Sequence, residues 1–228
     1  MIAAPSGLAL GGGCEILLHA DHVQAHAETY CGLVEVGVGL IPAWGGCKEM
    51  ILRFQAQQSA NHNDIWFSPA NDPMSAPRKA FETIGMATVA KSAAEAKAIG
   101  YFKDSDGITM NRDRLLFEAK EKALELSRGY EAPVPREDIR LPGPSGKMAL
   151  DMAVADLRKS GKATPYDVVV SGRLAAVLSG GKEGDWTRPL SETDMLELER
   201  SEFMELLHED GTIARIEHML DTGKPLRN

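Results

Sequence analysis

Three consecutive glycines, Gly11–Gly13, followed closely by Glu15, constrain the fold more than any other feature of this sequence. A glycine run costs backbone entropy on folding, so it is expected where the chain turns tightly or where its backbone approaches another group closely. If a helix begins at this run, its first amides direct the positive end of the helix dipole at a ligand. Such amides suit a developing oxyanion, and Glu15 would lie in the first helical turn just beyond them. Without a ligand, the same run is a tight strand-to-helix turn.

A second carboxylate, Glu35, follows in the apolar segment Gly32–Gly37. Because glycine, leucine and valine solvate a charge poorly, we expect desolvation to raise the pKa of this carboxyl group toward a useful acid/base range. Two carboxylates in different surroundings can divide the acid and base roles between them. Taken singly, Glu15 is a first-turn residue that the helix dipole favours, and Glu35 is one end of a buried ion pair. Their occurrence together favours a functional interpretation.

The rest of the pattern predicts short strands first and helices later. We expect strands at 23–27 and 30–36, a helix from about residue 43 to 57, and a loop over 58–76. Within that loop, 61–64 would form the tip, and Trp66 and Phe67 would anchor it. Beyond it the chain is mostly helical, with a proline-rich linker over 131–146 and one short strand. The expected later elements are a helix ending at Gly100, a strand at 108–110, and helices at 112–127, 145–160, from Pro165 to Gly180, at 195–208, and up to Gly223.

Composition excludes several classes of protein. The net charge of −8 argues against binding to nucleic acid, whose phosphates require clustered Lys and Arg. No apolar run approaches the length of a membrane helix, and the first residues do not resemble a signal peptide. The odd number of cysteines, Cys14, Cys31 and Cys47, without a CxxC pair, indicates free thiols in a reducing cytoplasm.

Several motifs lie close together over residues 3–53. They are Gly7-Leu8-Ala9-Leu10-Gly11-Gly12-Gly13-Cys14-Glu15, Asp21, Glu35-Val36, Gly39-Leu40-Ile41-Pro42 and Gly45-Gly46. Together they resemble the enoyl-CoA hydratase/isomerase signature of the crotonase superfamily, and it is the whole set that makes the match specific. The later segments 76–91, 92–102 and 217–225 resemble the C-terminal end of bacterial 3-hydroxyacyl-CoA dehydrogenases that are fused to a hydratase domain.

This resemblance implies an α/β fold, namely a partial crotonase ββα spiral followed by a mostly helical C-terminal region. It divides the chain into a core segment that carries the site, residues 1–57, a continuation of the same domain, 58–130, and a helical extension, 131–228. The implied reaction is the syn hydration of a trans-2-enoyl-CoA to a 3-hydroxyacyl-CoA in fatty acid β-oxidation. The Gly12 amide would hold the thioester oxygen, while Glu15 and Glu35 would handle the water and the α-proton, with the division of roles left open. No cofactor is required, the substrate carries CoA, and we expect a cytoplasmic homo-oligomer.

The sequence departs from the family pattern in three places. Ala43 follows Pro42 where the family usually has glycine, Trp44 precedes Gly45, and Val34 stands where many hydratases have proline. The family's first spiral turns, with the loop that supplies the other oxyanion amide, would lie upstream of Ala3. We therefore expect a truncated domain with little or no hydratase activity by itself.

Two other functions remain open. The first is double-bond isomerisation, which often needs one carboxylate only, so the presence of both favours hydration. The second is an inactive crotonase fragment that serves in assembly.

Two further kinds of site are not expected. His19, His22 and His26 have a spacing that suggests zinc, but their side chains would diverge where a helix passes into a strand, so we expect no metal site. A nicotinamide site is not expected within this chain either, because the pattern that begins at Gly37 ends on Pro42 where the dinucleotide motif needs glycine.

Overall fold

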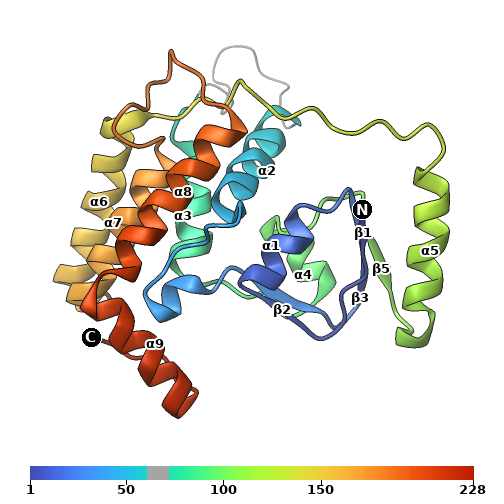
Figure 1. Cartoon of the computed structure of the whole chain (residues 1–228), viewed down its shortest axis with the longest axis horizontal. Coiled ribbons are helices and arrows are strands. Elements are labelled where there is room, and N and C mark those ends of the chain that lie inside the picture. The colour runs from blue at the N-terminus through green and yellow to red at the C-terminus, as the bar shows by residue number, and fades with distance from the viewer. Residues whose placement is uncertain (61–71) are drawn as a thin grey trace. The chain divides into compact units, whose positions relative to one another are not determined.

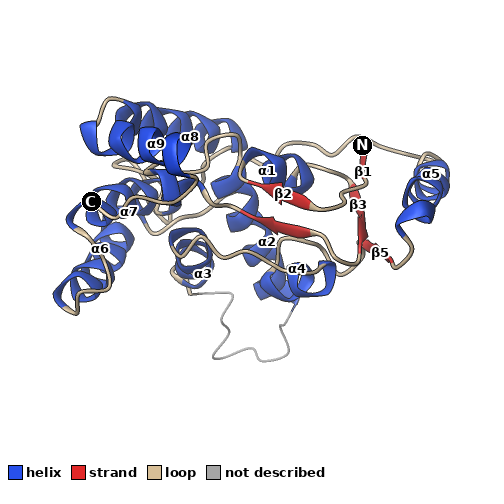
Figure 2. Cartoon of the chain, turned by 90° about the horizontal axis from the view of Figure 1, so that it is seen from below, coloured by secondary structure: helices blue, strands red, loops and turns tan. Residues whose placement is uncertain are grey.

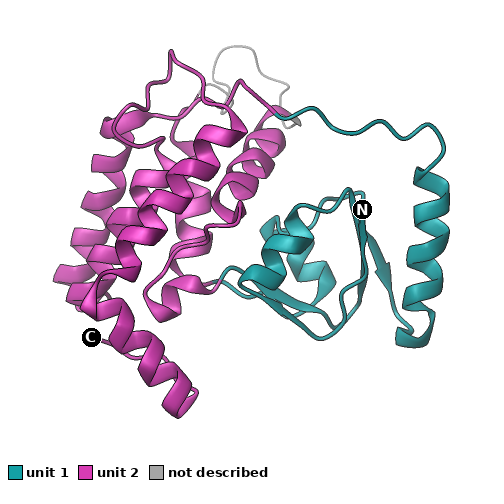
Figure 3. Ribbon diagram, viewed as in Figure 1, with its two compact units in different colours: residues 1–33, 88–135 teal, residues 34–87, 136–228 magenta. Residues whose placement is uncertain are grey.

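The computed structural model describes residues 1–60 and 72–228, which form two compact units (Figure 3). Unit 1 comprises residues 1–33 and 88–135, and unit 2 comprises residues 34–87 and 136–228. Each unit therefore combines two separate stretches of the chain. The predicted loop tip at 61–64 and its proposed anchors, Trp66 and Phe67, lie outside the described residues.

Unit 1 is built from short parallel strands and short helices (Figure 2). A three-stranded sheet has the order β1-β3-β5, with Ile2 opposite His22 and Gln24 opposite Gly107. A two-stranded sheet pairs β2 with β4. The strands of unit 1 are β1 (Ile2–Ala3), β2 (Leu8–Leu10), β3 (His22–His26), β4 (Tyr30–Gly32) and β5 (Gly107–Thr109). The helices of unit 1 are α1 (Gly12–Leu18), α4 (Ala93–Ile99), the 3-10 turn η3 (Arg112–Arg114) and α5 (Leu115–Leu126). Because β3 and β4 pair in parallel with β1 and β2, the second turn of the chain adds one strand to each sheet, which is the predicted spiral.

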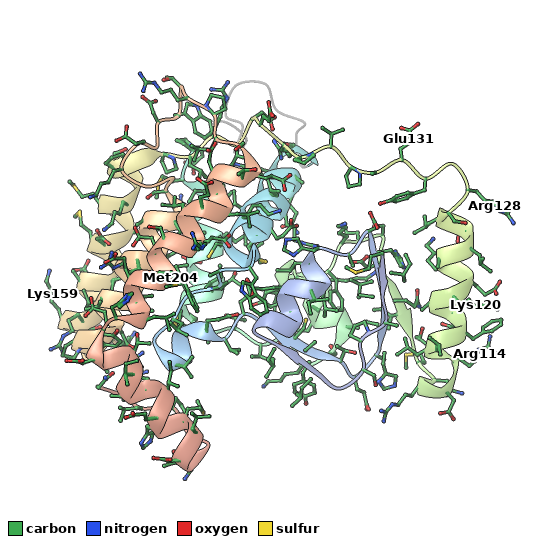
Figure 4. All side chains as sticks on the ribbon, viewed as in Figure 1. Arg114, Lys120, Arg128, Glu131, Lys159 and Met204 are labelled. Atoms are coloured by element: carbon green, nitrogen blue, oxygen red, sulfur yellow. The ribbon has the colours of Figure 1, made fainter. Side chains whose placement is uncertain are left out.

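Helix α5 covers strands β1 and β3 on one side and faces solvent on the other. Its inward residues Leu115 and Ala119 are buried. The charged side chains of Arg114, Lys120 and Arg128, along and beside this helix, project outward (Figure 4). The predicted helix over 112–127 is thus confirmed as a 3-10 turn that continues into an α-helix.

Unit 2 is helical (Figure 1). Its central helix is α7 (Pro165–Leu178), whose residues 174–178 are all buried and which packs on α3, α6 and α8. The other elements are η1 (Glu35–Val38), α2 (Gly46–Ala60), α3 (Ser75–Gly85), α6 (Gly143–Lys159), α8 (Glu192–Leu207) and α9 (Asp210–Thr222). None of the helices among the described residues has the length and apolar character that crossing a bilayer requires.

Local signals placed the helix ends correctly. Thr164 and Ser191 form capping boxes with Asp167 and Asp194, so their side chains satisfy the first amides of α7 and α8. Gly100 and Gly223 adopt the left-handed conformation at the ends of α4 and α9.

Candidate active site

The glycine run forms a turn between strand β2 and helix α1. Gly11 has φ 57° and ψ −127°, a conformation that a side chain would oppose, and its amide donates to the Gly32 carbonyl at 2.9 Å. Helix α1 begins at Gly12, so the prediction of a helix start here is confirmed. Inside a helix the amides of the first turn have no intrahelical acceptor, and those of Gly12 and Gly13 occupy these positions. Gly12 therefore stands where an oxyanion donor can operate.

Glu15 lies in the first turn of α1, as the sequence predicts, and is only 4% exposed. Its amide donates to the Gly11 carbonyl at 3.1 Å, which ties the carboxylate-bearing residue to the glycine turn. Its own carbonyl is 2.8 Å from Nδ1 of His19, at the other end of the helix. The backbone of Glu15 is thus hydrogen-bonded at both ends of a short helix whose residues Cys14, Glu15, Leu17 and Leu18 are buried.

Glu35 does not lie on a strand, and the predicted strand over 30–36 is wrong in its second half. Strand β4 ends at Gly32, and Glu35 opens the 3-10 turn η1. The turn closes because the Gly37, Gly39 and Leu40 amides donate to the carbonyls of Val34, Val36 and Glu35 at 3.0, 3.1 and 3.1 Å. Gly39, with φ 79°, supplies the left-handed residue that ends it. Both carboxylate oxygens of Glu35 are buried.

The two carboxylates belong to different units. Gly12 and Glu15 come together on α1 of unit 1, whereas Glu35 lies on η1 of unit 2. Their action on one substrate remains a prediction from the sequence.

The Gly45-Gly46 motif is anchored by a residue that the sequence did not indicate. Glu199 on α8 is fully buried, and its carboxylate accepts from the Gly45 amide at 2.7 Å and from the Lys48 amide at 2.6 Å. These amides belong to the N-terminus of α2, where glycine offers no side-chain oxygen, so Glu199 takes over the role of a capping residue. A helix start that lacks a local cap is the signal that could have suggested an acceptor from elsewhere.

Lys48 carries a positive charge in the same region. Its Nζ lies 2.7 Å from Glu49 and 2.7 Å from Glu192. Burial lowers the pKa of Lys48, but hydrogen bonds with Glu192 and Glu49 outweigh it and leave this pKa raised. The Lys48 ammonium group therefore stays charged, and its ion pair with Glu192 links α2 to α8.

A cavity of about 610 Å³ lies within unit 2 among helices α3, α6 and α7. Its walls are mainly apolar, with Phe81, Leu150 and Val170 among them, and Val36 and Gly37 bring η1 to its edge. Glu35 is not among the described residues that line the cavity. The cavity thus borders the turn η1 without being lined by the Glu35 carboxylate.

The three histidines do not gather. His19 ends α1, while His22 is buried on β3 with Nδ1 3.6 Å from Asp106 Oδ1 and Nε2 3.4 Å from Gln24 Oε1. His26 ends the same strand. In the described part of the chain, no group of three or more His, Cys, Asp or Glu side chains is arranged to hold a metal ion.

Known proteins resemble this chain in sequence and in fold. A Bacillus subtilis protein named "Probable 3-hydroxyacyl-CoA dehydrogenase" is 42% identical over 229 residues, covering 100% of this chain and 27% of that protein. The short-chain-enoyl-CoA hydratase of Clostridium acetobutylicum is 44% identical over 50 residues, or 22% of this chain and 19% of that enzyme. The solved structure of a carnitinyl-CoA dehydratase from Mycobacterium avium matches 99% of this chain and 62% of its own with a TM-score of 0.54 at 20% identity, a likeness of fold alone.

The B. subtilis and M. avium matches cover much of this chain but only part of the known proteins. The chain spans about a quarter of the B. subtilis relative, 27%. No family model matches the sequence. The matches therefore show the fold and the kinship of the sequence.

Proposed function

We propose, from the premise that this chain has the crotonase fold and is kin to bacterial enoyl-CoA hydratases and 3-hydroxyacyl-CoA dehydrogenases, that it carries out enoyl-CoA hydratase chemistry. Water adds across the double bond of a trans-2-enoyl-CoA, with oxygen joining C3 and a proton joining C2. Glu15 holds and deprotonates the water, Glu35 delivers the α-proton, and either can take the other's role. The Gly12 amide donates to the thioester oxygen as negative charge develops there.

One observation carries this proposal. A buried carboxylate, Glu15, lies in the first turn of α1, the same turn whose amides have no intrahelical acceptors. A general base and an oxyanion donor on the same helix are two of the groups that hydration of a conjugated thioester needs, and Glu35 would supply the proton. Hydration moves no electrons between reactants, so the reaction requires no redox cofactor, and CoA enters only as part of the substrate.

We further place this chemistry within a bifunctional 3-hydroxyacyl-CoA dehydrogenase/hydratase of β-oxidation. Support comes from the B. subtilis relative, which is named as a probable 3-hydroxyacyl-CoA dehydrogenase and whose match covers all of this chain. We expect a cytoplasmic homo-oligomer. The three cysteines, all within the described residues, are buried and form no disulfide, as suits a reducing compartment.

The test is the hydration of crotonyl-CoA, followed by loss of the conjugated thioester absorbance at high concentrations of the chain. We expect a low but measurable wild-type rate at these concentrations. Glu15→Gln and Glu35→Gln should each lower that rate by about 10²–10⁴-fold, while affinity for the acyl-CoA survives. Exposed glutamates serve as matched controls, Glu121→Gln in unit 1 and Glu197→Gln in unit 2, and both should keep the wild-type rate.

Three outcomes would contradict the proposal. A wild-type chain with no turnover would favour the inactive fragment. A wild-type rate in Glu15→Gln or Glu35→Gln would remove that residue from its role. Migration of the double bond in a 3-enoyl-CoA, without hydration, would favour isomerisation.

A further inference from the structure

A buried arginine of helix α9 is hydrogen-bonded to the turn that carries Glu35. Arg215 is only 2% exposed, and its Nη1 donates to the Val36 carbonyl at 3.2 Å. Its other nitrogens are also engaged, Nη2 with Asp167 Oδ1 at 2.7 Å and Nε with Asn228 Oδ1 at 2.7 Å. A guanidinium is costly to bury unless it is hydrogen-bonded and paired, and its planar fork holds fixed directions. Arg215 of α9 is therefore held in one orientation by hydrogen bonds that connect α9 to α7 and to η1.

A second residue of α9 holds the other end of the same turn. Thr212 is fully buried, and its hydroxyl donates to the Gly39 carbonyl at 2.7 Å. Since that hydroxyl proton is committed to Gly39, the hydroxyl of Tyr166, 2.7 Å away, must donate to Thr212 Oγ1. A Cβ on Gly39 would come within 3.1 Å of Thr212 Oγ1 and 3.2 Å of Arg215 Cδ. Helix α9 thus packs directly on the backbone of the turn.

Asp167, at the start of α7, fixes the position of Arg215. One of its carboxylate oxygens accepts a hydrogen bond from the Thr164 amide at 2.8 Å, and the other accepts one from Arg215. Burial raises the pKa of Asp167, but hydrogen bonds from the Thr164 backbone and from Arg215 outweigh it and hold this pKa below its usual value. Asp167 is therefore an ionised carboxylate, and its hydrogen bond with Arg215 is charge-assisted.

We propose that Thr212 and Arg215 are positioning residues, which fix the carbonyls of Val36 and Gly39 and thereby orient the Glu35 carboxylate for proton transfer. This inference rests on the proposed function. Neither side chain touches the reacting atoms, and both act through the backbone of η1. A displacement of about 1 Å in a reacting group can cost on the order of 10²-fold in rate, so holding a four-residue turn at both ends is significant for catalysis.

Hydrogen exchange tests the holding role without any need for catalysis. In Thr212→Val the Gly39 carbonyl loses its donor, so we expect the amides of Gly37, Gly39 and Leu40 to exchange about tenfold faster, with α3 amides unchanged. Thr212→Ser keeps the hydroxyl and should restore slow exchange. Arg215→Met should give the same acceleration, whereas the matched control Arg173→Met, which breaks contacts with Glu202 and Glu205 between α7 and α8, should leave these three amides unchanged.

Kinetics then test the positioning role. For crotonyl-CoA hydration, Thr212→Val should lower kcat about tenfold with KM nearly unchanged, and Thr212→Ser should recover most of kcat. Wild-type exchange in Thr212→Val would overturn the holding role. Faster exchange with unchanged kcat would overturn the positioning role. A wild type without turnover would remove the proposed function and the catalytic part of this inference, while exchange would still decide whether α9 holds η1.

Discussion

Replacement of Glu199 should destabilise unit 2 more than most single substitutions would. This carboxylate is fully buried on α8 and accepts two short hydrogen bonds from the amides of Gly45 and Lys48 at the start of α2. In Glu199→Gln the side chain keeps one acceptor, so one of the two amides faces an NH2 group instead of an oxygen. The negative charge that complements the dipole of α2 is lost as well.

The magnitude follows from these two losses. A hydrogen bond to a charged group contributes about 1.5–3 kcal/mol, and a helix dipole interaction in a buried setting contributes up to about 2 kcal/mol. We therefore expect Glu199→Gln to lower the free energy of unfolding by about 3 kcal/mol. For a chain of 228 residues this corresponds to a fall in Tm of about 6–12 °C.

Urea unfolding followed by circular dichroism measures this change. The matched control is Glu197→Gln on the same helix, whose side chain is exposed and whose substitution should change the free energy of unfolding by less than about 0.5 kcal/mol. A loss below about 1 kcal/mol in Glu199→Gln would show that this carboxylate does not cap α2.

Two further predictions concern the two units separately. The pKa of Asp167 is lowered from its ordinary 3.8, so its contribution to stability is present above that pH and is lost as pH falls below it; Asp167→Asn should flatten the decline of unfolding free energy between about pH 5 and pH 3, and parallel declines in urea titrations would contradict this. In unit 1, a Cβ on Gly32 would lie 2.6 Å from the Thr88 carbonyl oxygen, so Gly32→Ala should lower the free energy of unfolding by about 1–3 kcal/mol in the same assay. Gly37→Ala, where a Cβ meets nothing within 4 Å, is the matched control, and equal stabilities of the two variants would refute the close approach.

The elements that the sequence predicted well are those governed by neighbouring residues. The glycine run, the capping boxes that begin at Thr164 and Ser191, and the closing Gly100 act within one or two turns of the chain, so their residues alone indicate the outcome. The partial spiral in unit 1 was predicted through the resemblance to the crotonase superfamily and not from strand periodicity.

The conformation at Glu35 could not be predicted in the same way. The segment after Gly32 is apolar and rich in valine, which favours a strand, yet it forms a 3-10 turn. Two carbonyls of that turn are held by Thr212 and Arg215, more than 170 positions away. The cap of α2 by Glu199, 154 positions from Gly45, is a similar case. Contacts over such distances leave no periodicity or local motif in a single sequence.

The central claim, that Glu15 and Glu35 act on one acyl-CoA, is tested most directly by a crystal structure of the chain with 3-hydroxybutyryl-CoA. The hydroxyl oxygen of this product is the oxygen that water contributes. The account predicts both carboxylates within about 2.6–3.2 Å of that hydroxyl or of one water bound to it, with the Gly12 amide on the thioester oxygen. Carboxylates on opposite faces of the fold, or a thioester bound away from α1, would contradict it.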